Sequence, residues 1–341
     1  MMADKGPAKI KVANIPQVGI VCKDVQKTLE AFWNILGVGP WSIFEYGSPG
    51  ATGLKYRGAP GWGRFRVAVA HTEPIGIELI EHVEGTSIFR DWVDERGEGL
   101  HHLSMVVEDM EVQDVERELA RQGFPSIQSG YAGPDPEDRF SYFDMRLPLK
   151  TIIKVSGRPG HVPDGARRYP EDPHADSPAP FKIPGFKQIG IAVGDVYETA
   201  KNYWYLFGIS PWEIRDWGNH RLFLRTYYGK PSWAKEKLAH AYPGDMELEL
   251  MQGFEGPSIY QDWVDECGGG LHHLKFLCTD LDEVSSIFME QGFPSMQSGY
   301  FGDPKDKAGG FNYIDVPPIH CIMEPVHKPK TLPSEPIARI P

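Results

Sequence analysis

The chain has 341 residues, of which 41% are hydrophobic, and a formal net charge of −12 at pH 7. This length indicates two domains, and the apolar content is sufficient for a core in each. Lys and Arg are scattered through an acidic chain, which argues against nucleic acid or an anionic membrane as the main partner. No apolar run approaches the roughly 18 residues of a membrane span. Residues 1–14 lack a signal core, and the four cysteines show no disulfide pattern, so a cytoplasmic protein is expected.

In chain order, residues 17–22 alternate as a strand does, and Asp24 is placed to cap a helix that Gly37 ends. Three strands are expected next, at residues 40–46, 65–71 and 76–83. The same order then recurs, with a strand at residues 101–107 and a helix capped by Asp109. Three further strands are expected near residues 127–131, 140–145 and 151–155. The pattern therefore predicts two βαβββ units in this part of the chain.

The segment that contains both units is repeated about 171 positions later, and such a repeat decides the architecture. The string Gly99-Leu100-His101-His102-Leu103 returns as Gly270-Leu271-His272-His273-Leu274. Residues 158–184, rich in Pro, Gly and charge, are typical of a semi-rigid linker. The predicted organisation is a first domain at 1–157, this linker, a second domain at 185–330 and a tail at 331–341.

Four βαβββ units, with a Gly-Leu-His-His-Leu string and an acidic helix cap (Asp109, Asp280) in each half, resemble the vicinal oxygen chelate superfamily, and most closely its methylmalonyl-CoA epimerase-like members. The resemblance covers the chain apart from the linker and the tails. It implies an α+β fold in which four modules form two domains, each a curved eight-stranded sheet shaped as a cup around one divalent metal ion. It also implies an intramolecular pseudo-dimer, and a homodimer stays open.

In that family the metal ligands lie on the first, fourth, fifth and eighth strands of the cup. Carried over to the second half, these positions are Gln188, Glu249, His273 and Glu324, and Gln188 stands where His is usual. This oxygen-rich set suits Mn, Co, Fe, Ni, Zn or Mg. In the first half the positions are Gln17, Glu78, His102 and Lys154. A lysine repels a metal ion and is expected to pair with Glu78, so we expect the ion in the second half.

The resemblance further implies that the ion chelates two vicinal oxygens of a small organic substrate and acidifies a C–H bond next to a carbonyl. A base must then remove the proton. Rough alignment puts Lys237 at the position of the glutamate base of the epimerases. The candidate catalytic residues are Lys275, His240, Lys237 and Tyr313. Strand alternation puts Lys275 on the face of His273, where apolar walls and a metal ion would lower its pKa.

The predicted function is therefore a metal-dependent isomerase, epimerase or lyase. A ring-cleaving extradiol-type dioxygenase is an alternative, because dioxygenases of this superfamily hold iron with two histidines and a carboxylate, and His240 could supply the missing histidine. A non-catalytic binding or resistance protein is a second alternative. Residues 216–242 have no close counterpart in the first half and are expected to shape the entrance of the site.

Overall fold

The computed structural model describes residues 8–47, 52–218, 221–301, 309–328 and 335–341. The chain forms two compact units. The first consists of Met1–Lys182 with Leu206–Gly208 and Pro318–His320, and the second of Ile183–Tyr205, Ile209–Pro317 and Cys321–Pro341. The boundary between residues 182 and 183 lies at the end of the segment expected to be a linker.

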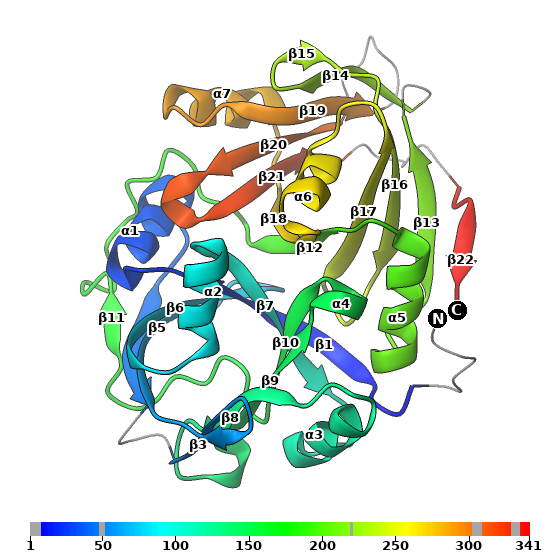
Figure 1. Cartoon of the computed structure of the whole chain (residues 1–341). Coiled ribbons are helices and arrows are strands. Elements are labelled where there is room, and N and C mark those ends of the chain that lie inside the picture. The colour runs from blue at the N-terminus through cyan, green and yellow to red at the C-terminus, as the bar shows by residue number, and fades with distance from the viewer. Residues whose placement is uncertain (1–7, 48–51, 219–220, 302–308, 329–334) are drawn as a thin grey trace. The chain divides into compact units, whose positions relative to one another are not determined.

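The first half contains the two predicted strand–helix–strands units, together with further short elements and helices at residues 88–96 and 146–149 that were not predicted (Figure 1). Its elements are β1 (Val12–Val21), α1 (Val25–Leu36), β2 (Trp41–Gly47), β3 (Thr52–Tyr56), β4 (Ala59–Pro60), β5 (Gly63–Ala70), β6 (Gly76–Gly85), α2 (Ile88–Arg96), β7 (Gly99–Val107), α3 (Val112–Arg121), β8 (Ser126–Tyr131), η1 (Pro136–Asp138), β9 (Arg139–Met145), α4 (Arg146–Leu149), β10 (Thr151–Ser156) and β11 (Arg167–Tyr169).

The second half repeats this order. Its elements are β12 (Phe186–Ala192), α5 (Val196–Phe207), β13 (Trp212–Trp217), β14 (Leu222–Tyr227), β15 (Lys230–Pro231), β16 (Lys235–Ala241), β17 (Glu247–Glu255), α6 (Ile259–Cys267), β18 (Gly270–Leu277), α7 (Leu281–Glu290), β19 (Ser295–Phe301), β20 (Gly310–Val316), η2 (Pro317–Ile319), β21 (Cys321–His327) and β22 (Ala338–Ile340).

Each half folds around one curved, mixed sheet (Figure 1). The strand order is β11-β2-β5-β6-β1-β7-β10-β9-β8-β3-β4 in the first and β15-β14-β19-β20-β21-β18-β12-β17-β16-β13-β22 in the second. At both centres an antiparallel pair, β1 with β7 or β12 with β18, is flanked by parallel strands. The predicted α+β fold, with two sheets built from βαβββ modules, is confirmed.

The sheets have 11 strands each over the described residues, rather than the eight expected. The expected cup of the first half consists of the eight neighbouring strands β2-β5-β6-β1-β7-β10-β9-β8. That of the second half consists of β13-β16-β17-β12-β18-β21-β20-β19. The additional strands are β3, β4 and β11, and β14, β15 and β22. They lie at the sheet edges, and most are too short to show a periodic pattern in the sequence.

Local signals explain most of the boundaries. Asp24 caps α1 by accepting a hydrogen bond from the backbone N–H of Lys27, and Asp280 caps α7 in the same way. The expected cap at Asp109 is wrong: α3 begins at Val112, and Asp109 adopts a left-handed conformation with φ of 50°.

The two segments expected to lack secondary structure contain short strands. Residues 167–169 of the predicted linker form β11, which pairs with β2. In the predicted tail, residues 331–334 lie outside the described residues, whereas β22 pairs with β13. Backbone pairing with an available sheet edge stabilises these segments, and their composition gives no sign of it.

Each half has its own apolar core, formed by aromatic and branched side chains between the sheet and its helices. The four cysteines form no disulfide with one another in the described structure. Among the described residues, no helix is long and apolar enough to cross a membrane.

Candidate metal centre

Four neighbouring strands at the centre of the second sheet carry the predicted ligands. Gln188 lies on β12, Glu249 on β17, His273 on β18 and Glu324 on β21. The register brings them to one face: Gln188 lies opposite Lys275, which in turn lies beside Glu324. Because these strands are flanked on both sides by others, their side chains are held by a continuous hydrogen-bonded sheet.

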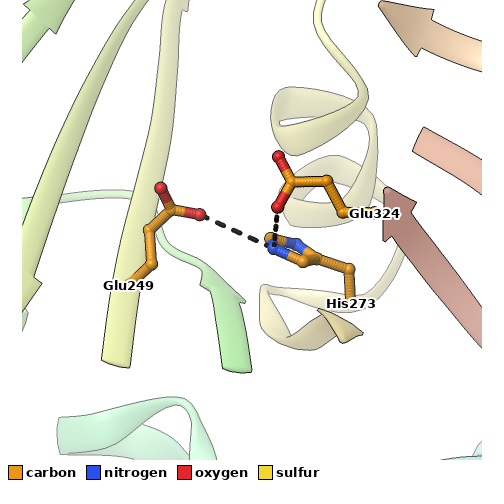
Figure 2. Close-up of side chains that lie close together, drawn as sticks. All are labelled: Glu249, His273 and Glu324. Atoms are coloured by element: carbon orange, nitrogen blue, oxygen red, sulfur yellow. Dashed lines mark ion pairs between the residues drawn. The ribbon is translucent and has the colours of Figure 1, made fainter. Parts of the chain in front are cut away.

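The carboxylates of Glu249 and Glu324 lie on either side of the His273 ring and face one ring nitrogen (Figure 2). The Nε2 atom of His273 lies 3.2 Å from Oε2 of Glu324, 3.6 Å from Oε2 of Glu249 and 3.4 Å from Oε1 of Gln188. All four side chains are buried. Within the described part of the chain, Glu249, His273 and Glu324 are the only three acidic, histidine or cysteine residues whose ligand atoms lie within 4.8 Å of one another.

The buried polar atoms of this cluster show that the residues fit a divalent ion. Among the described residues, Oε2 of Glu249 and Oε2 of Glu324 have no hydrogen-bond partner. Buried polar groups without partners are costly, and buried carboxylates normally have a counter-charge. Two carboxylates, an imidazole and an amide oxygen would be satisfied by an ion such as Mn, Fe, Co, Ni, Zn or Mg.

His240 joins this cluster from the neighbouring strand β16. Its Nε2 lies 2.9 Å from Oε1 of Glu249, and its other ring nitrogen has no partner in the described structure. Burial alone would raise the pKa of Glu249, but its hydrogen bond with His240 and the nearby cationic groups lower the net value below the usual range. His240 is therefore placed where it could exchange a proton with a substrate or become a further ligand.

Lys275 lies in the same cluster, as strand alternation predicted, but its charge state differs from the expectation. Its ammonium donates a hydrogen bond to Glu247 at 2.6 Å. Burial lowers the pKa of Lys275, but the attraction of Glu247, Glu324 and Glu249 outweighs burial and raises it. Lys275 is therefore held as a cation paired with Glu247 in this structure. Glu247 was missed in the sequence, although it lies two residues before Glu249 and hence on the same face.

The structure places the last two catalytic candidates differently. The ring of Tyr313 lies 4.9 Å from that of His273, and burial raises the pKa of its hydroxyl well above 10, so it stays protonated. Lys237 points away from the cluster, which corrects its predicted role. Its ammonium lies over the ring of Phe254 and 3.9 Å from Asp216, because it occupies the outer face of β16.

A cavity with about 840 Å³ of empty space, counting its mouth, opens at the cluster. Its wall combines the polar residues above with aromatic and aliphatic side chains, among them Trp217, Leu222, Tyr260, Phe301 and Phe311. Several of these come from residues 216–242, the stretch expected to shape the entrance. On β16 it is Glu236, not Lys237, that faces the cavity, where it forms a buried ion pair with Arg225 at 2.6 Å. The correct strand register would have selected Glu236.

The Nδ1 atoms of the two histidines in the string lie 3.3 Å apart, although consecutive residues of a regular strand face opposite sides. Pairing between β12 and β18 shifts between Gly190 and Ile191, so that His272 is an extra residue in a bulge. The ring of His273 packs directly over Gly190, where a Cβ atom would lie well inside 3.0 Å of it. Gly19 stands in the same relation to His102. Both positions therefore require glycine, because a histidine ring lies where a Cβ atom would be.

In the first half the same positions hold an ion pair. Lys154 donates to both carboxylate oxygens of Glu78, at 2.8 and 2.7 Å, and Nε2 of His102 lies 3.2 Å from Glu78. The predicted pair between Lys154 and Glu78 is thus confirmed. The ammonium stands where a metal ion would be held. Gln17, on the far side of β7 from Lys154, is also buried, and its amide oxygen has no partner in the described structure.

The model of the "Glyoxalase/Bleomycin resistance protein/Dioxygenase superfamily" matches residues 16–143 and again residues 187–311. Because these two matches cover well over half of the chain, the protein belongs to this superfamily. Their positions coincide with the internal repeat. No curated protein matches the chain in a sequence search.

Solved structures share the fold. A triple mutant of 4-hydroxymandelate synthase from Streptomyces coelicolor is 12% identical, with a TM-score of 0.59 over 93% of this chain and 92% of that one. A fusion of a xylose isomerase-like TIM barrel with 4-hydroxyphenylpyruvate dioxygenase is 13% identical, with a TM-score of 0.50. The latter match covers 97% of this chain and 51% of that chain.

Proposed function

We propose that the second half is a metal-dependent isomerase, epimerase or lyase, which moves a proton next to a carbonyl group of a small organic substrate. The observation that carries the proposal is the convergence of Gln188, Glu249 and Glu324 oxygens on Nε2 of His273, inside a cavity. Superfamily membership supports it, because one divalent ion held in such a cup is the chemistry that the resemblance implies. The first half, with Lys154 in place of a carboxylate, has a structural role in this proposal.

Gln188, Glu249, His273 and Glu324 would hold the ion, which would polarise a substrate carbonyl. His240 takes the proton from the neighbouring carbon at Nδ1, which has no hydrogen-bond partner among the described residues, and its Nε2–H donates to Glu249 and orients the ring. The ammonium of Lys275, fixed by Glu247, supplies positive charge that stabilises an anionic intermediate. Tyr313 and the other aromatic residues of the wall exclude water and position a flat or apolar substrate.

Metal content tests the proposal directly. We expect about one Mn, Fe, Co, Ni or Zn ion per chain in protein purified without added metal, as plasma mass spectrometry would measure it. Glu324→Ala should lose the ion. The matched control is Glu78→Gln in the first half, which should retain it. A wild-type protein that stays metal-free even after ions are added would refute the proposal and favour a metal-free binding protein.

The reaction can be followed without a known substrate. Exchange of the proton next to the carbonyl of 2-oxo and 2-methyl acids with deuterated water, measured by NMR, should require the ion. Loss of a general base costs roughly 10² to 10⁴ in rate, and His240→Gln should show such a loss with its metal content largely retained. Exchange that is unchanged in this variant would remove His240 from its assigned role.

A ring-cleaving or related dioxygenase is the second candidate, and one observation favours it. His240 lies 2.9 Å from Glu249, so that His240 and His273 could together offer the two imidazoles of an iron site. The dioxygenase and synthase named above share the fold. Oxygen uptake by the Fe²⁺-loaded protein with 4-hydroxyphenylpyruvate or catechol, abolished in His240→Gln, would support this candidate. Proton exchange without oxygen uptake would exclude it.

A further inference from the structure

The first histidine of each pair has no role in the site described so far. His272 is buried, and its Nδ1 lies 3.3 Å from Nδ1 of His273. The two rings are nearly perpendicular, at 87°. Its other nitrogen, Nε2, has no hydrogen-bond partner among the described residues. Trp263 and Tyr260 pack edge-on against the ring and hold it in this orientation.

The contact between the two Nδ1 atoms restricts where the protons are. In a neutral imidazole one nitrogen carries a proton and the other a lone pair. A hydrogen bond between the two rings therefore needs one Nδ1 with a proton and one without, so His272 and His273 must be opposite tautomers. The bulge in β18 makes this contact possible, because it brings consecutive side chains together.

The first half shows one of the two arrangements. Nε2 of His102 faces the carboxylate of Glu78 at 3.2 Å, so that nitrogen carries the proton. The Nδ1 atom of His102 then has a lone pair and accepts from Nδ1–H of His101, at 3.0 Å. A metal ligand needs the reverse, because Nε2 must offer its lone pair to the ion.

We propose that His272 is a positioning residue for the metal ligand His273: its Nδ1 accepts the Nδ1–H of His273 and so fixes the tautomer that leaves Nε2 free. This inference rests on the proposed metal centre. When the ion is held, the proton of His273 lies on Nδ1 and that of His272 on Nε2. Each ring keeps one proton, and neither becomes charged. Ligating histidines usually donate their second N–H to a carboxylate or carbonyl, and here an imidazole takes that place.

Zinc affinity measured by calorimetry tests the inference. His272→Phe keeps the ring packing but leaves Nδ1–H of His273 without an acceptor, and loss of such a partner typically weakens metal binding about 10- to 100-fold. We expect a weakening of this size, and a smaller one in His272→Gln, whose amide oxygen can accept. The matched control is His101→Phe, which should bind zinc as the wild type does.

The tautomers can also be measured on the wild-type protein, so the test does not depend on a variant that folds. With ¹⁵N-labelled histidine, zinc should move the proton of His272 from Nδ1 to Nε2, and His101 and His102 should not change. Unchanged zinc affinity in His272→Phe, or a His272 tautomer that zinc does not alter, would overturn this inference and leave the metal centre intact. A wild-type protein that binds no zinc or other divalent ion would overturn both.

Discussion

At the scale of single residues, the two halves differ most at the last ligand position. Glu324 on β21 and Lys154 on β10 occupy equivalent places. Glu324 pairs with Lys275 of β18, and Lys154 pairs with Ser104 of β7. The glutamate contributes an oxygen to a cluster of unsatisfied acceptors, whereas the lysine neutralises Glu78. Under the proposed function, we expect the charge of this one side chain to decide which cup holds a cation.

The first half should therefore become a metal site when Lys154 is replaced. In Lys154→Glu, the new carboxylate would join Gln17, Glu78 and His102, and we expect about two divalent ions per chain in place of one. Without metal this variant should lose roughly 3–5 kcal/mol of stability, because a buried ion pair is replaced by like charges. Metal analysis and urea unfolding would measure both effects. Lys154→Met, which adds no ligand, is the control and should gain no ion.

At the scale of elements, the bulge between the first and fifth strands of each cup shapes the site. It brings both histidines of a pair together, and a glycine on the opposite strand leaves room for the second ring. The arrangement is the same in both halves. It is therefore a property of the fold, which the second half uses for its candidate metal ligand.

A methyl group at this glycine should disturb the second half selectively. Gly190→Ala would push the ring of His273 from its place, and we expect loss of the ion together with a destabilisation of about 1–3 kcal/mol. Gly19→Ala makes the same intrusion on His102 and should cost similar stability without loss of metal. Metal content and urea unfolding of the two variants would separate these effects. Retention of the ion in Gly190→Ala would contradict the ligand role of His273.

At the scale of the whole molecule, each sheet encloses its own buried charges. Those of the first half should make the free energy of unfolding depend on pH in the acidic range. Burial alone would raise the pKa of Glu78, but Lys154 and His102 outweigh it and lower the pKa from 4.5 to about 2. A carboxyl group whose pKa is lowered by folding stabilises the protein at any pH above its pKa in the unfolded chain. That stability is lost as pH falls through the folded value.

We expect this group to contribute about 3 kcal/mol at neutral pH, and the contribution to disappear between about pH 4.5 and pH 2. The comparison is with Glu78→Gln/Lys154→Met, which lacks both charges and keeps the shapes. As pH falls, the wild type should lose that amount of unfolding free energy relative to the double variant. Parallel curves for the two proteins would show that the ion pair does not govern acid stability.

The amino-acid sequence by itself determined the architecture, because duplication and periodicity are local properties of the chain. The repeat, the order of the main strands and the clustering of Glu249, His273 and Glu324 could all be predicted, since strand alternation and the family resemblance place these three residues on one face. The ion pair of Lys154 with Glu78 could also be predicted, because the two residues carry opposite charges at two ligand positions of the same cup.

Tertiary structure alone decided what those residues contact. The bulge that joins His272 to His273 depends on pairing between strands far apart in the sequence, and no local pattern shows it. The direction of Lys237, the cavity position of Glu236 and the raised pKa of Lys275 follow from strand register and from charges on neighbouring strands. Such contacts are set by packing across the sheet, because the free energy of a buried charge depends on its partners rather than on its neighbours in the chain.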